Sequence, residues 1–178
     1  MWEEYEERIR GLEDRLEELK HAAEVGGVDL GNEISLIETR LGEAAREISE
    51  KLTPSDRVSL ARHPQRPRSI DFLRRIARDF LELHGDRSFG DDPAILAGLA
   101  TIAGREVLLL AQEKGADARE KAHRNFGMAN PEGYRKGIRL MHLAERMKRP
   151  VVAWIDTPGA YPGMGAEERG QAHAIAES

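Results

Sequence analysis

The amino-acid sequence predicts an α/β fold with an antiparallel element, preceded by a helical arm, and two observations support this class. Residues 1–53 have heptad-like apolar spacing, whereas residues 94–156 contain two strand-like segments, a helix-like segment and a further strand-like segment. Net charge also changes, from −8 over residues 1–53 to +3 over residues 54–178, which sum to the −5 of the chain. We therefore predict an arm over residues 1–53 and a domain over residues 54–178.

The arm is predicted to be a hairpin of two antiparallel helices. Apolar residues recur at steps of three and four in both halves, at Ile9, Leu12, Leu16 and Leu19 and then at Ile34, Ile37, Leu41, Ala44 and Ile48. Residues 26–32 contain three glycines that break the pattern, and Asn32 is the predicted N-cap of the second helix. Narrow apolar stripes are typical of a short coiled coil, so we expect the arm to serve assembly or packing rather than catalysis.

Two more helices are expected before the first strand. Thr53 is a suitable N-cap for one of them, with a proline after it and Asp56 in its first turn, and the two prolines of residues 63–67 end it. Ser69 is predicted to cap the next helix, which Gly85 ends. Its expected buried face comprises Ile70, Leu73, Ile76, Phe80 and Leu83.

Residues 94–156 are predicted to form the core of the domain. Residues 94–102 and 106–112 indicate two strands joined by a tight Ala103–Gly104 turn, and the second strand is apolar on both faces, which favours a central position. Residues 131–147 indicate a helix with a broad apolar side, followed by a buried strand over residues 150–156. The succession of strand, crossover helix and strand predicts a parallel pair.

The glycine-rich segment from Thr157 to Gly165 follows this last strand and precedes a helix expected from Ala166. Ligands of α/β sheets bind at the carboxyl ends of strands, where open backbone N–H groups bind a phosphate or polarise a carbonyl. The segment lacks the Lys-Ser/Thr ending of a nucleotide P-loop, and Glu167 and Glu168 disfavour a permanent phosphate. This favours a carbonyl that gains charge in the transition state, while a purely structural turn stays open as an alternative.

Two other groups of residues are weaker candidates. His84, Asp86, Asp91 and Asp92 suit either a metal site or the capping of turns, and turn capping is the more common use. Seven arginines with a single acidic residue among them suit phosphates of a nucleotide-like ligand or nucleic acid, an acidic partner, or a solvated face; they are Arg57, Arg62, Arg66, Arg68, Arg74, Arg75 and Arg78.

Composition excludes several classes of protein. The 178 residues include no cysteine, which excludes a disulfide scaffold, a zinc-thiolate site and a thiol nucleophile in this chain. The N-terminus is acidic where a signal peptide would be basic, and no apolar run approaches the length of about 20 residues that spans a bilayer. We expect a cytoplasmic protein without membrane contact, and the negative net charge argues against binding nucleic acid over the whole surface.

Several longer motifs, in order, resemble the carboxyltransferase α subunit of bacterial acetyl-CoA carboxylase. They are residues 60–67 (LARHPQRP), 82–87 (ELHGDR), 89–94 (FGDDPA), 124–128 (RNFGM), 131–136 (PEGYRK), 155–163 (IDTPGAYPG) and 165–171 (GAEERGQ). The resemblance covers essentially the whole chain. It implies a crotonase-like (ClpP/crotonase) core behind the helical hairpin.

The resemblance also implies a function. The family transfers the carboxyl group from carboxybiotin, presented by a biotin carboxyl carrier protein, to acetyl-CoA, giving malonyl-CoA for fatty acid biosynthesis. It does so in an ATP-dependent complex with biotin carboxylase, in which the α subunit joins a β subunit as α₂β₂. No covalently bound cofactor and no metal are expected on this chain, because zinc is expected only on the β subunit.

Site residues follow from the turn and from the resemblance together. The predicted catalytic residues are Gly159, Ala160 and Gly163, and the predicted substrate-binding residues are Tyr161, Pro162, Gly165, Gly133, Tyr134 and Arg135. A second glycine-rich segment of the family, of Gly-Gly-Ser-Gly-Gly-Ala type, is absent, so we expect an N-terminal portion with an incomplete core that is inactive alone. The alternatives are another crotonase-fold acyl-CoA enzyme, such as a hydratase or isomerase, and a non-catalytic assembly or nucleic-acid-binding fragment.

Overall fold

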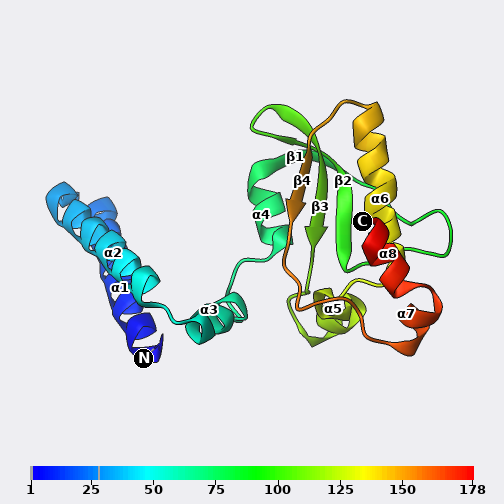
Figure 1. The fold of residues 1–178 in the computed structure, drawn as a ribbon. Helices are drawn as coiled ribbons and strands as arrows, with labels where there is room; N and C mark the ends of the chain where they lie inside the picture. The colour runs from blue at the N-terminus through cyan, green and yellow to red at the C-terminus, as the bar shows by residue number, and fades with distance from the viewer. Residues whose placement is uncertain (1, 28) are drawn as a thin grey trace. The chain divides into compact units, whose positions relative to one another are not determined.

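A computed structural model describes residues 2–27 and 29–178 of the chain (Figure 1). The chain forms two compact units, residues 1–66 and residues 67–178, which we call the first unit and the sheet unit. The predicted α/β class is confirmed, because the sheet unit combines a four-stranded sheet with helices. Among the helices of the described residues, none combines the length and apolar character needed to cross a membrane.

The first unit contains the predicted pair of helices, α1 (Trp2–Gly26) and α2 (Gly31–Lys51). Ion pairs join Arg8 to Glu47 at 3.2 Å and Lys20 to Glu38 at 2.9 Å, so the two helices run antiparallel. The prediction of Asn32 as N-cap is wrong. The helix already begins at Gly31, whose N–H donates to Asp29 Oδ1 at 3.1 Å, so the aspartate takes up a free donor at this end of the helix.

Helix α3 (Pro54–Ala61) also lies in the first unit and begins as predicted. The Asp56 N–H donates to Thr53 Oγ1, and the Asp56 carboxylate accepts the Thr53 N–H in return. This reciprocal arrangement is a capping box, which satisfies two N–H groups that a helix end would otherwise leave unpaired. The helix ends before the two prolines of residues 63–67, as predicted.

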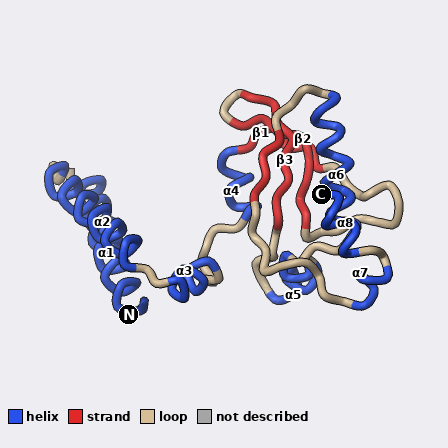
Figure 2. The backbone as a smooth tube through the Cα atoms, in the orientation of Figure 1, coloured by secondary structure: helices blue, strands red, loops and turns tan. Residues whose placement is uncertain are grey.

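The sheet has the order β1 (Ala77–Glu82), β2 (Ile95–Ile102), β3 (Arg105–Gln112) and β4 (Val151–Trp154), as Figure 2 shows. The β1–β2 and β2–β3 pairs are antiparallel, and β3 pairs with β4 in parallel. The predicted hairpin between the second and third strands is confirmed, and its two turn residues, Ala103 and Gly104, have φ values of 50° and 76°. Strand β3 has a neighbour on each side, which confirms its predicted interior position.

One long helix and one short helix cover opposite faces of the sheet (Figure 1). Helix α4 (Ser69–Ile76) contributes Leu73 to a core with Leu96 and Leu109. Helix α6 (Pro131–Arg146) contributes Leu140 and Ala144 to the core on the other face. The remaining helices are α5 (Ala118–His123), a 3₁₀ turn (Asn125–Gly127), α7 (Met164–Glu168) and α8 (Gln171–Glu177).

The predicted helix from Ser69 to Gly85 is wrong in its second half. The helix ends at Ile76, and the chain continues as β1, in which Phe80 packs against the core as a strand residue. The apolar spacing of residues 70–76 belongs to a short helix, and pairing with β2 decides the conformation of the residues that follow. Ser69 is the first helical residue rather than the N-cap, because its Oγ donates to the Gln112 carbonyl at 2.6 Å instead.

Candidate functional site

Three loop segments meet where β3 and β4 end. The Asp156 N–H, just after β4, donates to Gln112 Oε1 at 2.8 Å, and the Asp156 carboxylate pairs with Lys114 Nζ at 2.6 Å. Thr157 Oγ1 lies 2.7 Å from the Gly127 carbonyl, which connects the glycine-rich turn to the loop before α6. The carboxyl ends of these parallel strands therefore carry a cluster of loops, the place where α/β sheets bind ligands.

The glycine-rich turn is fixed to the loop before α6 by a backbone bridge. Ala160 pairs with Ala129 in parallel, and the Tyr161 N–H donates to the Ala129 carbonyl at 3.0 Å. The Gly159 N–H is also occupied, because it donates to Thr157 Oγ1 at 3.1 Å. Within residues 2–27 and 29–178, the backbone N–H groups of Ala160 and Gly163 donate to no acceptor. These two N–H groups are thus available to a ligand, as are those of Thr157, Met164 and Gly165, which also donate to no acceptor among the described residues.

The glycines at the two ends of this turn have different surroundings. Gly159 is exposed, has a φ of 154°, and would place a Cβ in open space. Gly163 has an ordinary φ of −77°, but a Cβ there would overlap with the ring of Tyr161. The close approach of the ring therefore requires glycine at position 163, and the Tyr161 ring covers one side of the turn.

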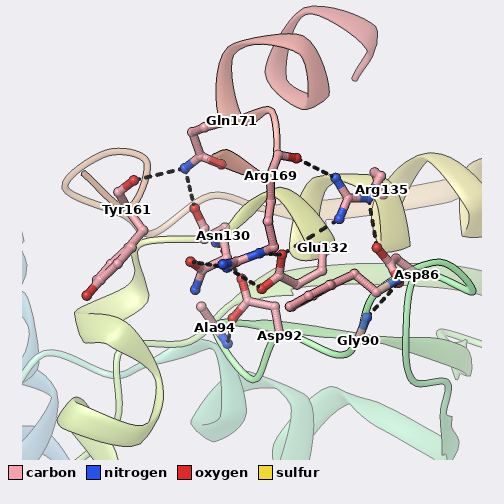
Figure 3. Close-up of polar contacts among 12 residues, drawn as sticks. Asp86, Gly90, Asp92, Ala94, Asn130, Glu132, Arg135, Tyr161, Arg169 and Gln171 are labelled. Carbon is pink, nitrogen blue, oxygen red and sulfur yellow. Dashed lines mark hydrogen bonds and ion pairs between the residues drawn. The ribbon is translucent and has the colours of Figure 1, made fainter. Parts of the chain in front are cut away.

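Gln171 contacts both the glycine-rich turn and the loop before α6, as Figure 3 shows. Its Nε2 donates to the Ala129 carbonyl at 2.9 Å and to the Tyr161 carbonyl at 3.1 Å. The residue is buried at the first position of α8. One side chain thus contacts both segments of the backbone bridge.

Asp92 organises the loop on the other side of the bridge. Its Oδ1 accepts the Ala94 N–H at 2.9 Å, and its Oδ2 accepts the Asn130 N–H at 2.7 Å (Figure 3). Burial raises the pKa of the Asp92 carboxyl above its ordinary value, although these two hydrogen bonds act in the opposite direction. Gly133 packs against this carboxylate, since a Cβ at Gly133 would lie 2.6 Å from Asp92 Oδ2.

Two arginines connect the start of α6 to the segment between α7 and α8 (Figure 3). Arg169 forms a bidentate pair with Glu132, at 2.9 and 3.2 Å, and its guanidinium lies 4.6 Å from the centre of the exposed Phe89 ring. Arg135 donates to Asp86 Oδ2 at 2.7 Å and to the Arg169 carbonyl at 3.1 Å. The pairing with Glu132 raises the pKa of Arg169, so this guanidinium stays charged.

Asp86 ends this network on the loop after β1. Its Oδ1 accepts the backbone N–H groups of Ser88, Phe89 and Gly90 at 2.8–2.9 Å. Burial alone would raise the pKa of Asp86, but these three hydrogen bonds and the one from Arg135 outweigh it and lower the pKa to about 2. The carboxylate is therefore ionised at neutral pH and caps the turn.

The four residues considered for a metal site, His84, Asp86, Asp91 and Asp92, contact backbone N–H groups and charged side chains of neighbouring segments. Lys136 is buried and donates to Asp91 Oδ1 at 2.6 Å and to the Asp92 carbonyl at 2.8 Å. Asp91 also accepts the Gly85 N–H and lies 2.9 Å from His84 Nδ1. Burial acts to raise the pKa of Asp91, but the hydrogen bond from Lys136 and the other two hold it below its ordinary value.

The predicted site residues lie at the same end of the sheet in two groups, one on the glycine-rich turn and one at the start of α6. Ala160, Gly163 and Tyr161 lie on the turn, Pro162 is exposed beside them, and Gly165 lies next to Arg169. Gly133 and Arg135 lie at the start of α6, but they face Asp92 and Asp86 and are used in packing and ion pairing. Burial raises the pKa of Tyr134, the third of this set. The substrate-binding role of these residues stays a prediction.

Four residues at this site are not among those predicted. Thr157 and Gln171 fix the turn, and Glu132 and Arg169 fix the segments beside it. Each is a polar residue inside one of the motifs on which the resemblance rests, and that was the available signal. Their partners are far away in the sequence, so spacing alone could not assign them a role.

The arrangement suits stabilisation of a developing negative charge. It supplies unpaired backbone N–H groups on a braced turn, and the carboxylates of Asp86, Asp92 and Glu132 beside it are held in ion pairs or accept backbone N–H groups. Fixed N–H dipoles of this kind stabilise an oxyanion without reorganising during the reaction.

The chain is similar to several known proteins. A family model described as acetyl co-enzyme A carboxylase carboxyltransferase-like matches residues 2–178. The acetyl-coenzyme A carboxylase carboxyl transferase subunit alpha of Thermus thermophilus is 53% identical over 175 residues, covering 98% of this chain and 55% of the relative. The same subunit of Geobacillus kaustophilus is 49% identical over 175 residues, with 98% and 54% covered.

The chain thus spans about half the length of the curated relatives it matches. Among solved structures, transcarboxylase 12S with methylmalonyl-coenzyme A and methylmalonic acid bound is similar with a TM-score of 0.46 and 19% identity, over 74% of this chain and 28% of that chain. On the family match and on the two relatives, the chain belongs to the acetyl-CoA carboxylase carboxyltransferase-like family.

Proposed function

We propose that this chain supplies part of the carboxyltransferase site that converts acetyl-CoA to malonyl-CoA with carboxybiotin as the carboxyl donor. Its membership of the family and the names of its relatives support this reaction over hydration or isomerisation of an acyl-CoA. The structural observation that carries the proposal is the pair of unpaired N–H groups, of Ala160 and Gly163, on the turn at the carboxyl end of β4.

The chemistry needs such donors more than it needs an acid or a base from the protein. The N–CO₂ bond of carboxybiotin breaks, and negative charge develops on the ureido oxygen of biotin. The freed ureido nitrogen takes a proton from the methyl group of acetyl-CoA, and the resulting enolate forms a carbon–carbon bond to CO₂. Both the ureido oxygen and the enolate oxygen gain charge in the transition state, so backbone N–H groups aimed at either lower the barrier.

We assign the turn to the biotin side of the site. Thr157 and the Ala129–Ala160 bridge fix its backbone, which keeps the Ala160 and Gly163 N–H groups in place before the reaction begins. The Tyr161 ring lies against Gly163 and gives the turn an apolar wall beside these donors. This suits the bicyclic ring of biotin, which is apolar apart from its ureido group.

The partners we propose are those of the family. A carboxyltransferase β subunit completes an α₂β₂ enzyme, and a biotin carboxyl carrier protein presents the biotin that biotin carboxylase has carboxylated. We propose that the arm, residues 1–53, serves this assembly. Its narrow stripe buries only Ala44 and Ile48 among the described side chains of the arm and leaves Val25 and Leu36 exposed.

A matched pair of variants at position 163 tests the donor role directly. Gly163→Ala and Gly163→Pro both place a Cβ against the Tyr161 ring, but only proline removes the N–H. The φ of −77° at Gly163 is one that proline adopts, so the backbone itself is compatible with both. Loss of an oxyanion donor costs about 10²–10³ in kcat. We therefore expect the proline variant to turn over about 10²–10³ more slowly than the alanine variant.

The assay is malonyl-CoA formation by the complete natural product of the gene, assembled with a β subunit and supplied with carboxybiotin and acetyl-CoA. Circular dichroism and association with the β subunit show whether each variant still folds and assembles. Equal turnover by two folded, assembled variants would show that the Gly163 N–H has no part in the reaction.

A further inference from the structure

Gln171 occupies a position that the proposed reaction does not use directly. It follows Gly170, whose φ is 80°, and begins α8, which packs beside α6 (Figure 1). Its side chain is buried, with 3% of the residue exposed, although glutamine usually lies on the surface. Its place in a short helix does not by itself explain why this amide is buried.

The contacts of its amide nitrogen give that reason. Nε2 donates to the Ala129 carbonyl at 2.9 Å and to the Tyr161 carbonyl at 3.1 Å (Figure 3). The Ala129 carbonyl also accepts the Tyr161 N–H at 3.0 Å. The amide therefore lies across the two segments that form the Ala129–Ala160 bridge and prevents them from separating.

The chemistry of these contacts selects glutamine. The two protons of a neutral amide nitrogen suit two backbone carbonyls, whereas a lysine or arginine would bring a buried charge into the same place. Gln171 Oε1 is buried and accepts no hydrogen bond within the described part of the chain, so the contacts that place this side chain are the two made by Nε2.

We infer that Gln171 is a positioning residue for carboxyl transfer, because its amide fixes the backbone that directs the Ala160 and Gly163 N–H groups. This inference rests on the proposed function for its catalytic meaning. Residues 160 and 163 lie on either side of Tyr161, whose carbonyl Gln171 holds. Movement of that peptide group would shift the neighbouring peptide groups that carry the two donors, without removing either donor.

The inference predicts how kinetics change when the clamp is removed. Gln171→Met keeps the length and approximate volume of the side chain and removes both donors. Misplacement of catalytic donors by about 1 Å costs up to about 10²-fold in rate, so we expect kcat to fall at least about tenfold. The KM for acetyl-CoA should change less than about threefold, because the lost stabilisation is made in the transition state.

A second measurement does not depend on carboxyl transfer. The Tyr161 N–H is held in the bridge that Gln171 closes, so its hydrogen exchange in Gln171→Met should be at least about tenfold faster than in the parent. Gln171→Asn keeps the amide on a side chain one methylene shorter and should give intermediate values of both exchange and kcat. His173→Met is the matched control, because it places the same side chain at an exposed position of the same helix and should leave both values unchanged.

Both measurements use the complete natural product of the gene, with a β subunit for the kinetic part. The inference is overturned if folded Gln171→Met keeps its Tyr161 exchange rate and its kcat within about twofold of the parent, or if only KM changes. Should Gln171→Met not fold, Gln171→Asn decides by the same criteria, and failure of both to fold would make Gln171 a folding residue instead. A parent enzyme that forms no malonyl-CoA refutes the proposed function, whereas the exchange result still decides whether Gln171 fixes the turn.

Discussion

The first unit and the sheet unit differ in where their charged side chains lie. In the first unit, the pairs between α1 and α2 lie on the surface, and both side chains of the Lys20–Glu38 pair are about half exposed. In the sheet unit, Lys136, Glu113 and Asp92 are each only 1% exposed, and each makes hydrogen bonds to the backbone of another segment. The same residue types therefore cover a surface in one unit and fix loops in the other.

The difference shows where each unit derives its order. Exposed ion pairs contribute about 0–1 kcal/mol and are screened by salt, so the helical pair depends on its narrow apolar stripe. Buried charged groups lose solvation and are tolerated only when fully paired, so each specifies one arrangement of its partners. In the sheet unit, such buried groups fix the loop between β1 and β2 to the start of α6, beside the glycine-rich turn.

The largest effect on stability is expected from the buried lysine. Lys136→Met fills the space of the lysine stem but removes the donor to Asp91 and to the Asp92 carbonyl. Breaking a buried pair leaves its partners uncompensated, and because Asp91 is partly exposed we expect a loss of about 3 kcal/mol in the free energy of unfolding. Urea denaturation at neutral pH measures it.

Lys20→Met is the matched control in the first unit. It removes the same charge from an ion pair of similar length, at 2.9 Å, but on an exposed surface. We expect its urea midpoint to stay close to that of the parent. If both substitutions destabilise the protein equally, burial is not what distinguishes the two units.

The next largest effect concerns acid stability. The pKa of Asp86 is lowered to about 2 in the folded protein, against an ordinary value of 3.8, so its ionised form stabilises the fold above pH 4. This stabilisation, about 2 kcal/mol, is lost as the pH falls from 4 towards 2. Asp86→Asn lacks this titration, so its thermal midpoint should fall less steeply over that interval than the parent's. Parallel profiles for the two proteins would contradict the assignment.

Local patterns were sufficient to predict much of the fold. The hairpin of the arm follows from its apolar spacing, and the cap at Thr53 and the turn at Ala103–Gly104 follow from residue types whose preferences act within a few positions. Residues 77–82 could not be predicted in this way. Their helical spacing continues that of α4, and only pairing with β2, about 20 residues later, makes them a strand.

The location of the candidate site could be predicted from the sequence, but the residues that brace it could not. A glycine-rich segment after a predicted strand was enough to locate the turn. The prediction that this strand is buried is wrong, because β4 lies at the edge of the sheet and none of its residues is buried. The residues that brace it were not accessible to the same reasoning, because Gln171 contacts Ala129 across 42 positions and Arg169 contacts Glu132 across 37. For Arg135, the resemblance implied substrate binding, which stays a prediction, and the structure adds an ion pair to Asp86.

A smaller effect is expected when the arm is removed. Deletion of residues 1–53 should weaken association with the β subunit by at least about tenfold, or about 1.4 kcal/mol, while the sheet unit keeps its fold. The motivation is the exposed apolar side chains of the arm, at Val25 and Leu36, and its net charge of −8. Sedimentation of the two subunits together measures association, and circular dichroism checks the remaining structure. Unchanged association would leave the arm without a role in assembly.

The smallest effect is expected from salt. Raising NaCl from 0.1 to 1 M shortens the Debye length from about 10 Å to about 3 Å, which weakens exposed ion pairs and hardly affects buried ones. The Arg8–Glu47 and Lys20–Glu38 pairs join α1 to α2, so hydrogen exchange of amides in these helices should become slightly faster at high salt. Amides of β2 and β3 should not respond in the same direction, because their strands are held by backbone pairing and apolar burial.

A double variant separates screening from the other effects of salt. Lys20→Gln with Glu38→Gln removes one exposed pair and keeps polar side chains of similar size at both positions. If screening of this pair causes the faster exchange, the double variant should respond less to salt than the parent does near the ends of α1 and α2 that the pair joins. A response equal to that of the parent would mean that the pair adds nothing to the packing of the two helices. The apolar stripe alone would then hold the hairpin together, and the contrast with the sheet unit would be greater still.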